Sequence, residues 1–401
     1  MYCEKCGSEL IDGSKYCSNC GAKVSGVYPG GARSTKDTVA SAAKYFGQGA
    51  SKAANSFTRN LTGNENGEPV EIHFRDLFSG IFKKHTEEEK ISLFICGTRR
   101  TTPEAENISN EWPSPWLFSR IFVYLLISTI LLYLLIFKFN VINAVPGYMF
   151  VSSALGPVTV MVFFFEVNIP RDIGIVKVME MFLLGGILSL VATILLGQFI
   201  YEDCSLIGSI GIGIAEEVGK AAIVYAYLRR KKGHRYILNG LLIGSAVGAG
   251  FAAFESAGYA FTSFIGELNS FSGLFLSEMG DYSSSYSQMQ NTIIIRAILS
   301  LGGHVIWAAI SGAAICASSK GEEPKAESLL SFSFLGAFII PVMLHAFWDW
   351  YFTDVLGDLK YIILIVAAWI VGMIYISRGI REINRISALA GSAPLPDQPK
   401  S

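Results

Sequence analysis

The sequence predicts an all-α polytopic membrane protein: about eight transmembrane helices that enclose a polar cavity, preceded by a small zinc ribbon. Of the 401 residues, 51% are hydrophobic and only 16% are charged, against about 25% charged in ordinary soluble domains. The mean hydropathy of +0.42 agrees with this class. The formal net charge of -1, without a basic strip of interleaved aromatic residues, gives no reason to expect a nucleic-acid partner.

The first 25 residues carry two cysteine pairs with the spacing of zinc knuckles. Each pair has the form C-x-x-C and precedes a glycine, which lets the backbone turn under a metal ion. We therefore expect a zinc ribbon over residues 1–25, with a structural zinc held by Cys3, Cys6, Cys17 and Cys20. The alternative, a disulfide pair, is disfavoured because the cytoplasm keeps thiols reduced. The segment resembles the zinc ribbons of many microbial membrane proteins, which implies an adaptor role toward a protein partner.

A linker and a juxtamembrane segment are expected next, over residues 26–112. Residues 26–68 are rich in Gly, Ser, Ala, Asn and Thr, which is typical of a linker. Residues 69–112 mix apolar and charged side chains and are expected to form a short cytoplasmic element against the membrane.

The spanning domain is expected over residues 113–380, followed by a cytoplasmic tail over residues 381–401. A helix that crosses a bilayer needs about 17 to 25 predominantly apolar residues. Eight stretches meet this requirement, near residues 117–137, 145–165, 179–200, 206–228, 237–265, 293–317, 330–352 and 361–378.

The charge of the short loops predicts that both termini lie in the cytoplasm. Lysine and arginine near helix ends stay on the cytoplasmic side, and residues 229–235 after the fourth stretch read RRKKGHR. Residues 267–291, by contrast, contain acids but no lysine or arginine. We therefore expect a multi-pass protein of the plasma membrane, embedded in the lipid bilayer.

Eight ionisable residues interrupt four consecutive apolar stretches. Each costs roughly 2.5 to 3.5 kcal/mol at the centre of a spanning helix, so eight isolated placements would cost roughly 20 kcal/mol, more than the net stability of a typical domain. They must therefore gather and compensate one another. They are Glu216, Glu217 and Lys220 in the fourth stretch, Glu255 in the fifth, Arg296 and His304 in the sixth, and His345 and Asp349 in the seventh.

Helical spacing predicts how these residues pair. Lys220 follows Glu216 by four positions and Glu217 by three, so it can pair with either acid, as a counter-ion or as a catalytic group. His345 and Asp349 lie one turn apart, which suits a metal site or an acid that orients a base. For Arg296 we expect a structural role, either paired with an acid or reaching toward the interface.

Glycines favour close helix contacts in the same region. Gly240, Gly244 and Gly248 recur at four-residue intervals along the fifth stretch. Such a face of small residues lets two helix backbones approach closely in a membrane.

Four polar motifs follow one another on consecutive stretches. They are E-E-x-x-K at residues 216–220, F-x-x-x-E at 251–255, His304 in a G-G-H-V setting, and H-x-x-x-D at 345–349. In this order they resemble the PrsW family of intramembrane proteases, within the wider group of CAAX prenyl endopeptidases and Abi-type membrane proteins. The prenyl endopeptidase branch typically has E-E-x-x-x-R and F-x-x-x-H, so Lys220 and Glu255 favour the PrsW branch.

The resemblance covers about residues 115–380 and implies a protease that cleaves a membrane-associated protein. The best-known activity in the family is site-1 cleavage of an anti-sigma factor. The motif residues expected to form the active-site cavity are Glu216, Glu217, Lys220, Glu255, His304, His345 and Asp349.

Activated water is the expected nucleophile, because no serine or cysteine stands near a base in this set and no H-E-x-x-H is present. Glu216 or Glu217 would be the general base, and the tighter spacing to Lys220 favours Glu217. In one version, His304, His345 and Asp349, with Glu255 as a further candidate, hold a catalytic zinc that activates the water. In the other, no metal is bound and a histidine donates to the oxyanion. Analogy with the wider group favours the metal-free version.

Two other functions compete with proteolysis. Buried acids, lysine and histidines are also normal in a transporter or proton-coupled channel, but the inverted repeats and paired broken helices of such proteins are not visible. The third alternative is a catalytically silent scaffold that binds partners through its zinc ribbon.

Overall fold

The computed structural model describes residues 78–108, 112–200, 205–231, 233–270, 282–351 and 357–391. The predicted zinc ribbon, with Cys3, Cys6, Cys17 and Cys20, and most of the predicted linker lie outside these residues. Within them every regular element is a helix, and no strand occurs. The all-α prediction is confirmed.

The helices of the described part follow the predicted order. A short helix, α3, precedes the long ones, and a π-helical turn at Met181–Gly185 joins α6 to α7. The bounds are α3 (Glu87–Phe94), α4 (Leu117–Phe137), α5 (Val145–Val167), α6 (Ile175–Glu180), α7 (Gly186–Gly197), α8 (Leu206–Arg230), α9 (Ile237–Leu268), α11 (Ser283–Leu299), α12 (His304–Ser318), α13 (Ala326–Leu329), α14 (Phe332–Asp349) and α15 (Leu359–Gly391).

Seven helical segments of the described part are long and apolar enough to cross a membrane. The remaining predicted span is α8, whose 25 residues suffice in length but carry the acids and the lysine at their centre. Together they make the expected set of about eight. The last helix, α15, continues to Gly391, beyond the predicted span 361–378. The placement of both termini in the cytoplasm stays a prediction.

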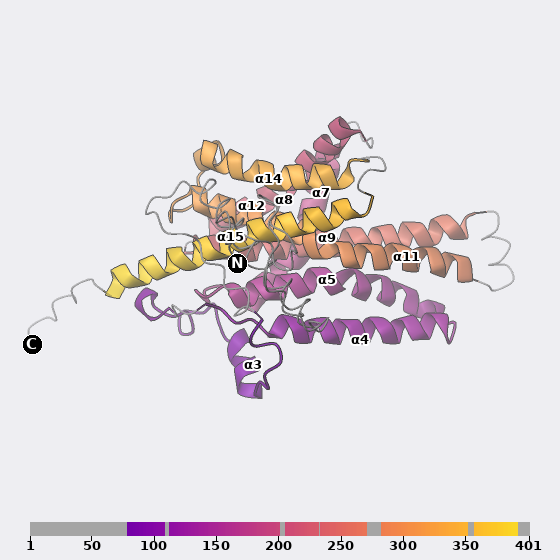
Figure 1. The fold of residues 1–401 in the computed structure, drawn as a ribbon, viewed down its shortest axis with the longest axis horizontal. Helices are drawn as coiled ribbons and strands as arrows, with labels where there is room; N and C mark the ends of the chain where they lie inside the picture. Colours follow the sequence, from indigo (N-terminus) through magenta and orange to yellow (C-terminus); the bar gives the residue numbers. More distant parts are fainter. Residues whose placement is uncertain are drawn as a thin grey trace, which may run out of the picture. The chain divides into compact units, whose positions relative to one another are not determined.

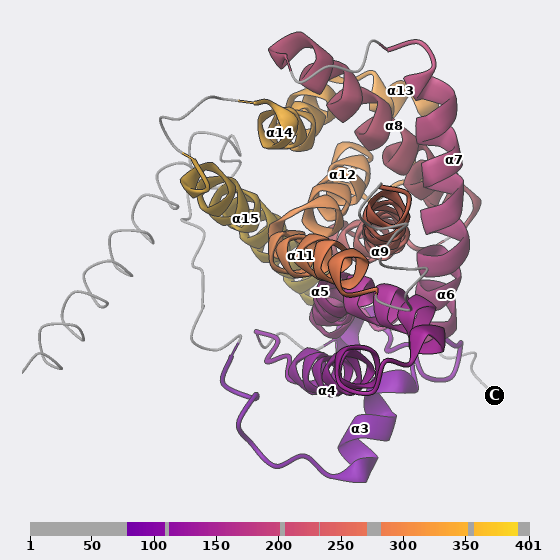
Figure 2. The same cartoon turned by 90° about the vertical axis from the view of Figure 1, so that its right-hand side faces the viewer.

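The long helices pack around α9. In the most apolar part of α9, 94% of the residues are buried, against 6% in α4, so α9 is central and α4 is peripheral. Figure 2 looks along α4, α5 and α11, and it shows α9 beside α12. The helices α6 and α7 run along the right-hand edge of this view. In Figure 1, α4 lies beside α5 and α11 lies beside α9.

The predicted glycine face of α9 packs directly on α12. A Cβ atom added at Gly240 would lie 2.2 Å from the carbonyl oxygen of Gly312, and one added at Gly244 would lie 2.1 Å from that of Ala308. At Gly248 the nearest atom would be the carbonyl oxygen of His304, at 2.4 Å. The close approach expected from the glycine spacing is confirmed, and it fixes the backbone of His304 against α9.

The sixth predicted span is broken in its middle. The helix α11 ends at Leu299, a 3-10 turn covers Ser300–Gly302, and α12 begins at His304. Gly303 has φ -96° and ψ -136°, which is neither helical nor extended. Irregular backbone at membrane depth is tolerated only where it is buried in protein or lines a hydrated cavity. The break therefore points to a polar cavity beside His304.

A carboxylate from α5 caps the beginning of α4. Glu166 is buried, and its Oε1 accepts the backbone N–H groups of Trp116 and Leu117 at 2.9 and 2.8 Å. Its Oε2 accepts that of Phe118 at 2.8 Å. The first N–H groups of a helix have no partner within the helix, and α4 has no side-chain cap of its own. Glu166 thus supplies the missing acceptors and the negative charge that a helix amino terminus favours.

Replacing Glu166 by glutamine is expected to lower the free energy of unfolding by about 1.5 to 3 kcal/mol, the usual worth of a hydrogen bond to a charged group. The amide keeps the size of the side chain but loses the charge and presents an NH₂ group to one of the N–H donors. Denaturant unfolding in mixed micelles measures the change. Glu180→Gln is the control, because Glu180 pairs with Lys177 while 40% exposed, and a change within about 0.5 kcal/mol is expected there. Equal losses in both variants would contradict the capping role.

Candidate active site

The helix α8 carries a fully buried ion pair at its centre. Lys220 and Glu217 are both 0% exposed, and the lysine Nζ donates to Glu217 Oε1 at 2.8 Å. The same Nζ donates to Glu216 Oε2 at 3.1 Å and lies 4.0 Å from the ring centre of Phe251. Both spacings that the sequence offered to Lys220 are therefore used at once. The phenylalanine of the F-x-x-x-E motif serves as a cation–π partner.

His345 is held between carboxylates. Its Nδ1 lies 3.0 Å from Glu217 Oε1, and its Nε2 lies 3.3 Å from Asp349 Oδ2 and 3.6 Å from Glu216 Oε2. The ring also stacks on Trp307, with 4.7 Å between the ring centres. Close packing of α8 on α14 makes this arrangement possible, since a Cβ added at Gly213 would lie 3.5 Å from the Cβ of His345.

His304 connects the lysine to a second ion pair. Its Nδ1 lies 3.0 Å from Lys220 Nζ, and its Nε2 lies 3.0 Å from Glu255 Oε2. Arg296 pairs with the same Glu255 oxygen and donates to Ser256 Oγ at 2.9 Å. The position of His304 follows from the break in the span, which makes it the first residue of α12.

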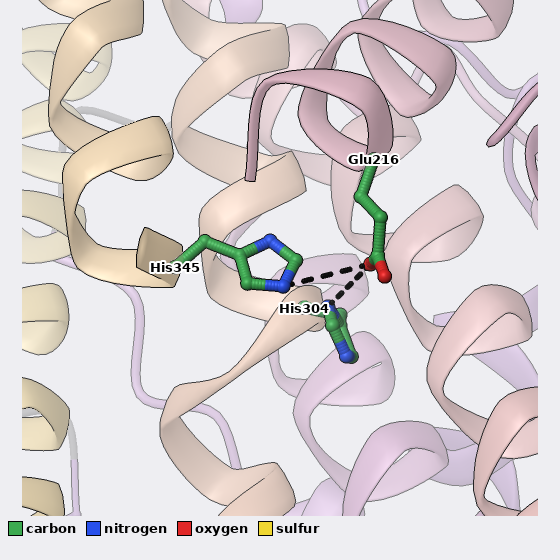
Figure 3. Close-up of side chains that lie close together, drawn as sticks. All are labelled: Glu216, His304 and His345. Carbon is green, nitrogen blue, oxygen red and sulfur yellow. Dashed lines mark ion pairs between the residues drawn. The ribbon is translucent and has the colours of Figure 1, made fainter. Parts of the chain in front are cut away.

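Glu216, His304 and His345 converge on one point. Figure 3 shows both imidazole rings facing the carboxylate of Glu216, with a dashed line from each ring to the same oxygen. Glu216 Oε2 lies 3.8 Å from His304 Nδ1 and 3.6 Å from His345 Nε2. One ligand atom from each residue falls within 4.8 Å of the others, which makes this trio a candidate metal site among the described residues.

A cavity of about 450 Å³ opens beside this trio. The two glutamates differ in their access to it: Glu216 lines the cavity, whereas Glu217 does not and is 0% exposed. Residues from α8, α9, α11, α12 and α14 form its walls. Those that carry polar groups are Glu216, Glu255, Ser256, Tyr259, Arg296, Ser300, His304, Trp307, His345, Trp348 and Asp349.

All seven motif residues predicted for the site lie in one connected cluster. Lys220 joins Glu216, Glu217 and His304, while Glu255 reaches His304 and Asp349 reaches His345. The ionisable groups are thus paired, as the energetic argument required.

Two basic residues near the site make contacts that the sequence analysis did not predict, in addition to the expected pairing of Arg296 with an acid. Arg296 lines the cavity itself, where it pairs with Glu255 and lies 4.3 Å from the ring centre of Tyr259. The four-residue spacing of Glu255 and Tyr259 was an available signal for a shared face. Lys360 donates to the backbone oxygens of Trp348 and Trp350 at 3.1 and 2.8 Å, which fixes the end of α14 beside Asp349. No local pattern in the sequence indicates that contact.

The fold and the site define a polytopic membrane protein in which paired acids, histidines and a lysine surround a cavity. Residues 174–376, just over half of the chain, match the PrsW family, described as PrsW family intramembrane metalloproteases. The chain therefore belongs to the PrsW family of intramembrane proteases. The matched region contains every motif residue of the cluster, so the resemblance read from the four motifs is confirmed.

A second match lies at the amino terminus, where residues 2–24 match a zinc-ribbon domain. The predicted ribbon is thereby confirmed as a domain, and its four cysteines fall inside the match. Comparison with curated proteins and with solved structures finds no match.

Proposed function

We propose that the chain hydrolyses a peptide bond of a membrane-protein substrate with a water molecule activated by Glu216. The observation that supports this role is the position of the Glu216 carboxylate, which lines the cavity and lies within 3.8 Å of both imidazole rings. Glu217, which the sequence spacing favoured as base, is enclosed by Lys220 and His345 instead. Since a base must reach the proton that it removes, we assign Glu217 to positioning.

The proposed reaction begins when Glu216 Oε2 takes a proton from the water as the water oxygen attacks the carbonyl carbon. The negative charge on the carbonyl oxygen is then stabilised by N–H donors of the cavity, with Nε2–H of a doubly protonated His345 as the nearest candidate, since its Nδ1 faces Glu217. The C–N bond breaks as the amine leaving group takes the proton back from Glu216. The products are a carboxylic acid and an amine, and the water supplies all the added atoms.

Glu217, Lys220 and Glu255 act through other residues in this scheme. Glu217 holds His345 by its Nδ1, which leaves Nε2 directed toward Glu216. The Lys220 ammonium lies between Glu216 and Glu217 and balances their charge. Glu255 fixes the orientation of the His304 ring through Nε2.

The family description implies a metal ion, and the donors of the site fit one. Two imidazole nitrogens and one carboxylate oxygen are a ligand set of catalytic zinc, and they come from Glu216, His304 and His345. The hydrogen bond between His345 Nδ1 and Glu217 is the usual support of a metal-bound histidine. When bound, such an ion would polarise the carbonyl group and lower the pKa of water.

Lys220 competes with an ion for these donors. Its Nζ lies 3.0 Å from His304 Nδ1 and 3.1 Å from Glu216 Oε2, so a positive charge already stands beside two of the three. The predicted ligand set of His304, His345 and Asp349 contained a different carboxylate. Asp349 lies 3.3 Å from His345 Nε2, but the carboxylate that converges with both histidines is that of Glu216. We favour the metal-free version on these grounds.

Zinc analysis of the purified full chain decides between the two versions. We expect one zinc per chain, held by Cys3, Cys6, Cys17 and Cys20, and an unchanged content in His345→Ala. A Cys17→Ser variant should lose that zinc, because structural sites need all four ligands. Two zinc ions per chain, one of them lost in His345→Ala, would instead assign a catalytic metal.

The test of the proposed function is direct cleavage. The purified chain is placed in phosphatidylethanolamine–phosphatidylglycerol vesicles with a library of single-span reporter peptides, and mass spectrometry identifies the products. Cleavage within the spanning segments is expected. Proton or ion flux without any product would favour the transporter alternative, and neither flux nor product would favour the silent scaffold. An anti-sigma factor-like substrate stays a prediction from the family resemblance.

A further inference from the structure

A second cavity is also lined by Glu216. It measures about 310 Å³ and lies between α7 and α8, partly open to the outside, near the lower end of the range of about 300 to 1,000 Å³ found for ligand pockets. Its walls include Thr193, Ile194 and Gly197 from α7, and Ile212, Ala215 and Glu216 from α8.

The two cavities meet at α8. Ile212 and Glu216, one helical turn apart, line both the 450 Å³ cavity and the 310 Å³ cavity. The residue that we assign as the base therefore belongs to the walls of both spaces. A peptide lying across Glu216 would have room for a side chain on each side.

The chemistry of the two spaces differs. The larger cavity presents Glu255, Arg296 and Asp349. In the smaller one, Glu216 is the only charged residue among the described lining residues, and the apolar ones are Ile194, Gly197, Ile200, Ile212 and Ala215. Thr193 and Gln198 are its uncharged polar residues in the described part of the chain, so the surface that faces a bound side chain is mainly apolar.

We propose that the smaller cavity is a substrate subsite that accepts an apolar side chain next to the cleaved bond. This inference rests on the proposed function. A substrate helix must unwind locally before water can attack, because its backbone groups are hydrogen-bonded within the helix. In the extended segment that results, neighbouring side chains point to opposite sides. With the cleaved bond at Glu216, one flanking side chain enters the apolar cavity and the other enters the polar one.

The substrate class follows from this division. It is a membrane-spanning segment cut where an apolar residue adjoins a small or polar residue. Such a pair occurs where the apolar part of a spanning segment is interrupted, and an interruption of that kind also eases local unwinding of the helix.

Substitution of Ile194 tests the subsite, because Ile194 lines the cavity and is 64% exposed, so that larger and smaller residues are tolerated. The probe is the library of single-span reporter peptides with randomised central residues in the same vesicles. For the wild-type chain we expect cuts beside leucine, isoleucine, phenylalanine or methionine. In Ile194→Trp, which fills the cavity, cuts beside these residues should fall roughly 10-fold or more relative to cuts beside alanine or glycine. In Ile194→Ala, the preference should move toward phenylalanine and tryptophan.

Leu195→Trp is the matched control, since Leu195 is the next residue on α7, is 57% exposed and does not line the cavity. Its cleavage profile should equal that of the wild-type chain. If the wild-type chain cuts the library but both Ile194 variants keep the wild-type profile, the subsite is overturned while the proposed function stands. If the wild-type chain yields no product, the proposed function is overturned and the subsite with it.

Discussion

Replacing Glu216 by glutamine is expected to lower the rate of peptide cleavage by about 10²- to 10⁴-fold, the usual contribution of a general base. The amide has nearly the same size and still lines the cavity, but it cannot take a proton from water. Binding of the reporter peptide should change little, because the variant removes a proton acceptor rather than a cavity wall. Initial rates in vesicles, together with the peptide concentration at half-maximal rate, measure the two effects separately.

Glu216→Asp sharpens this expectation. The shorter side chain keeps the charge but withdraws the carboxylate from His304 and His345, and a displacement of about 1 Å in a catalytic group can cost about 10²-fold in rate. Glu322→Gln is the control, since Glu322 pairs with Lys325 at the surface, 73% exposed. Cleavage by Glu216→Gln at the wild-type rate would remove Glu216 from the mechanism and return the role of base to another carboxylate.

Replacing Lys220 by methionine is expected to destabilise the fold by about 3 kcal/mol, because loss of one partner leaves a buried charge uncompensated. The acid concerned is Glu217, which is 0% exposed and has no hydrogen-bond partner for its Oε2 in the described part of the chain. The expected value is at the lower end of the usual range of about 3 to 5 kcal/mol, since His345 still contacts Glu217 Oε1. Denaturant unfolding in mixed micelles measures the loss.

The double variant Glu217→Gln/Lys220→Met separates stability from catalysis. Without either charge, most of the lost stability should return, because removing both members of a buried pair is far less costly than removing one. Cleavage should stay low, since His345 loses the carboxylate that orients it. A single Lys220→Met variant as stable as the wild-type chain would show that Glu217 does not depend on this lysine.

The sequence predicted that the ionisable residues of the spanning helices cluster, because burying each of them alone in the bilayer would cost too much free energy. Ionisable groups in a bilayer cannot remain apart at the cost of each isolated placement, so four helices that carry them must meet. The order of the motifs and the glycine spacing along α9 then indicate which helices are neighbours. Hydropathy likewise predicts the spans, because the bilayer sets their length.

Which of Glu216 and Glu217 faces the cavity could not be predicted from the sequence. Both acids pair with Lys220, so the tighter spacing that favoured Glu217 as the base did not decide between them. Their difference arises from the rotation of α8 against α14, where a Cβ added at Gly213 would lie 3.0 Å from the carbonyl oxygen of Val342. That contact turns Glu217 toward His345 and leaves Glu216 facing the cavity. It is a property of two helices packed together and is absent from the sequence of either one.

The break between α11 and α12, just before His304, could be predicted only in part from the sequence. Two glycines precede this histidine, but glycines are common in spanning helices, and the apolar stretch continues across them. Helix ends also differ from the predicted spans, as α9 reaches Leu268 and α15 reaches Gly391. In these places the helix extends beyond the apolar stretch, and hydropathy carries no signal for such an extension.

The capping of α4 by Glu166 has a consequence for the folding of the chain during synthesis. Synthesis proceeds from the amino terminus, so Trp116, Leu117 and Phe118 leave the ribosome well before Glu166 does. Until α5 arrives, the first N–H groups of α4 lack the carboxylate that they bind in the finished protein. We therefore expect α4 and α5 to reach their final packing together. An error at Glu166 would reduce the number of assembled molecules, while each molecule that assembles would keep its catalytic groups in place.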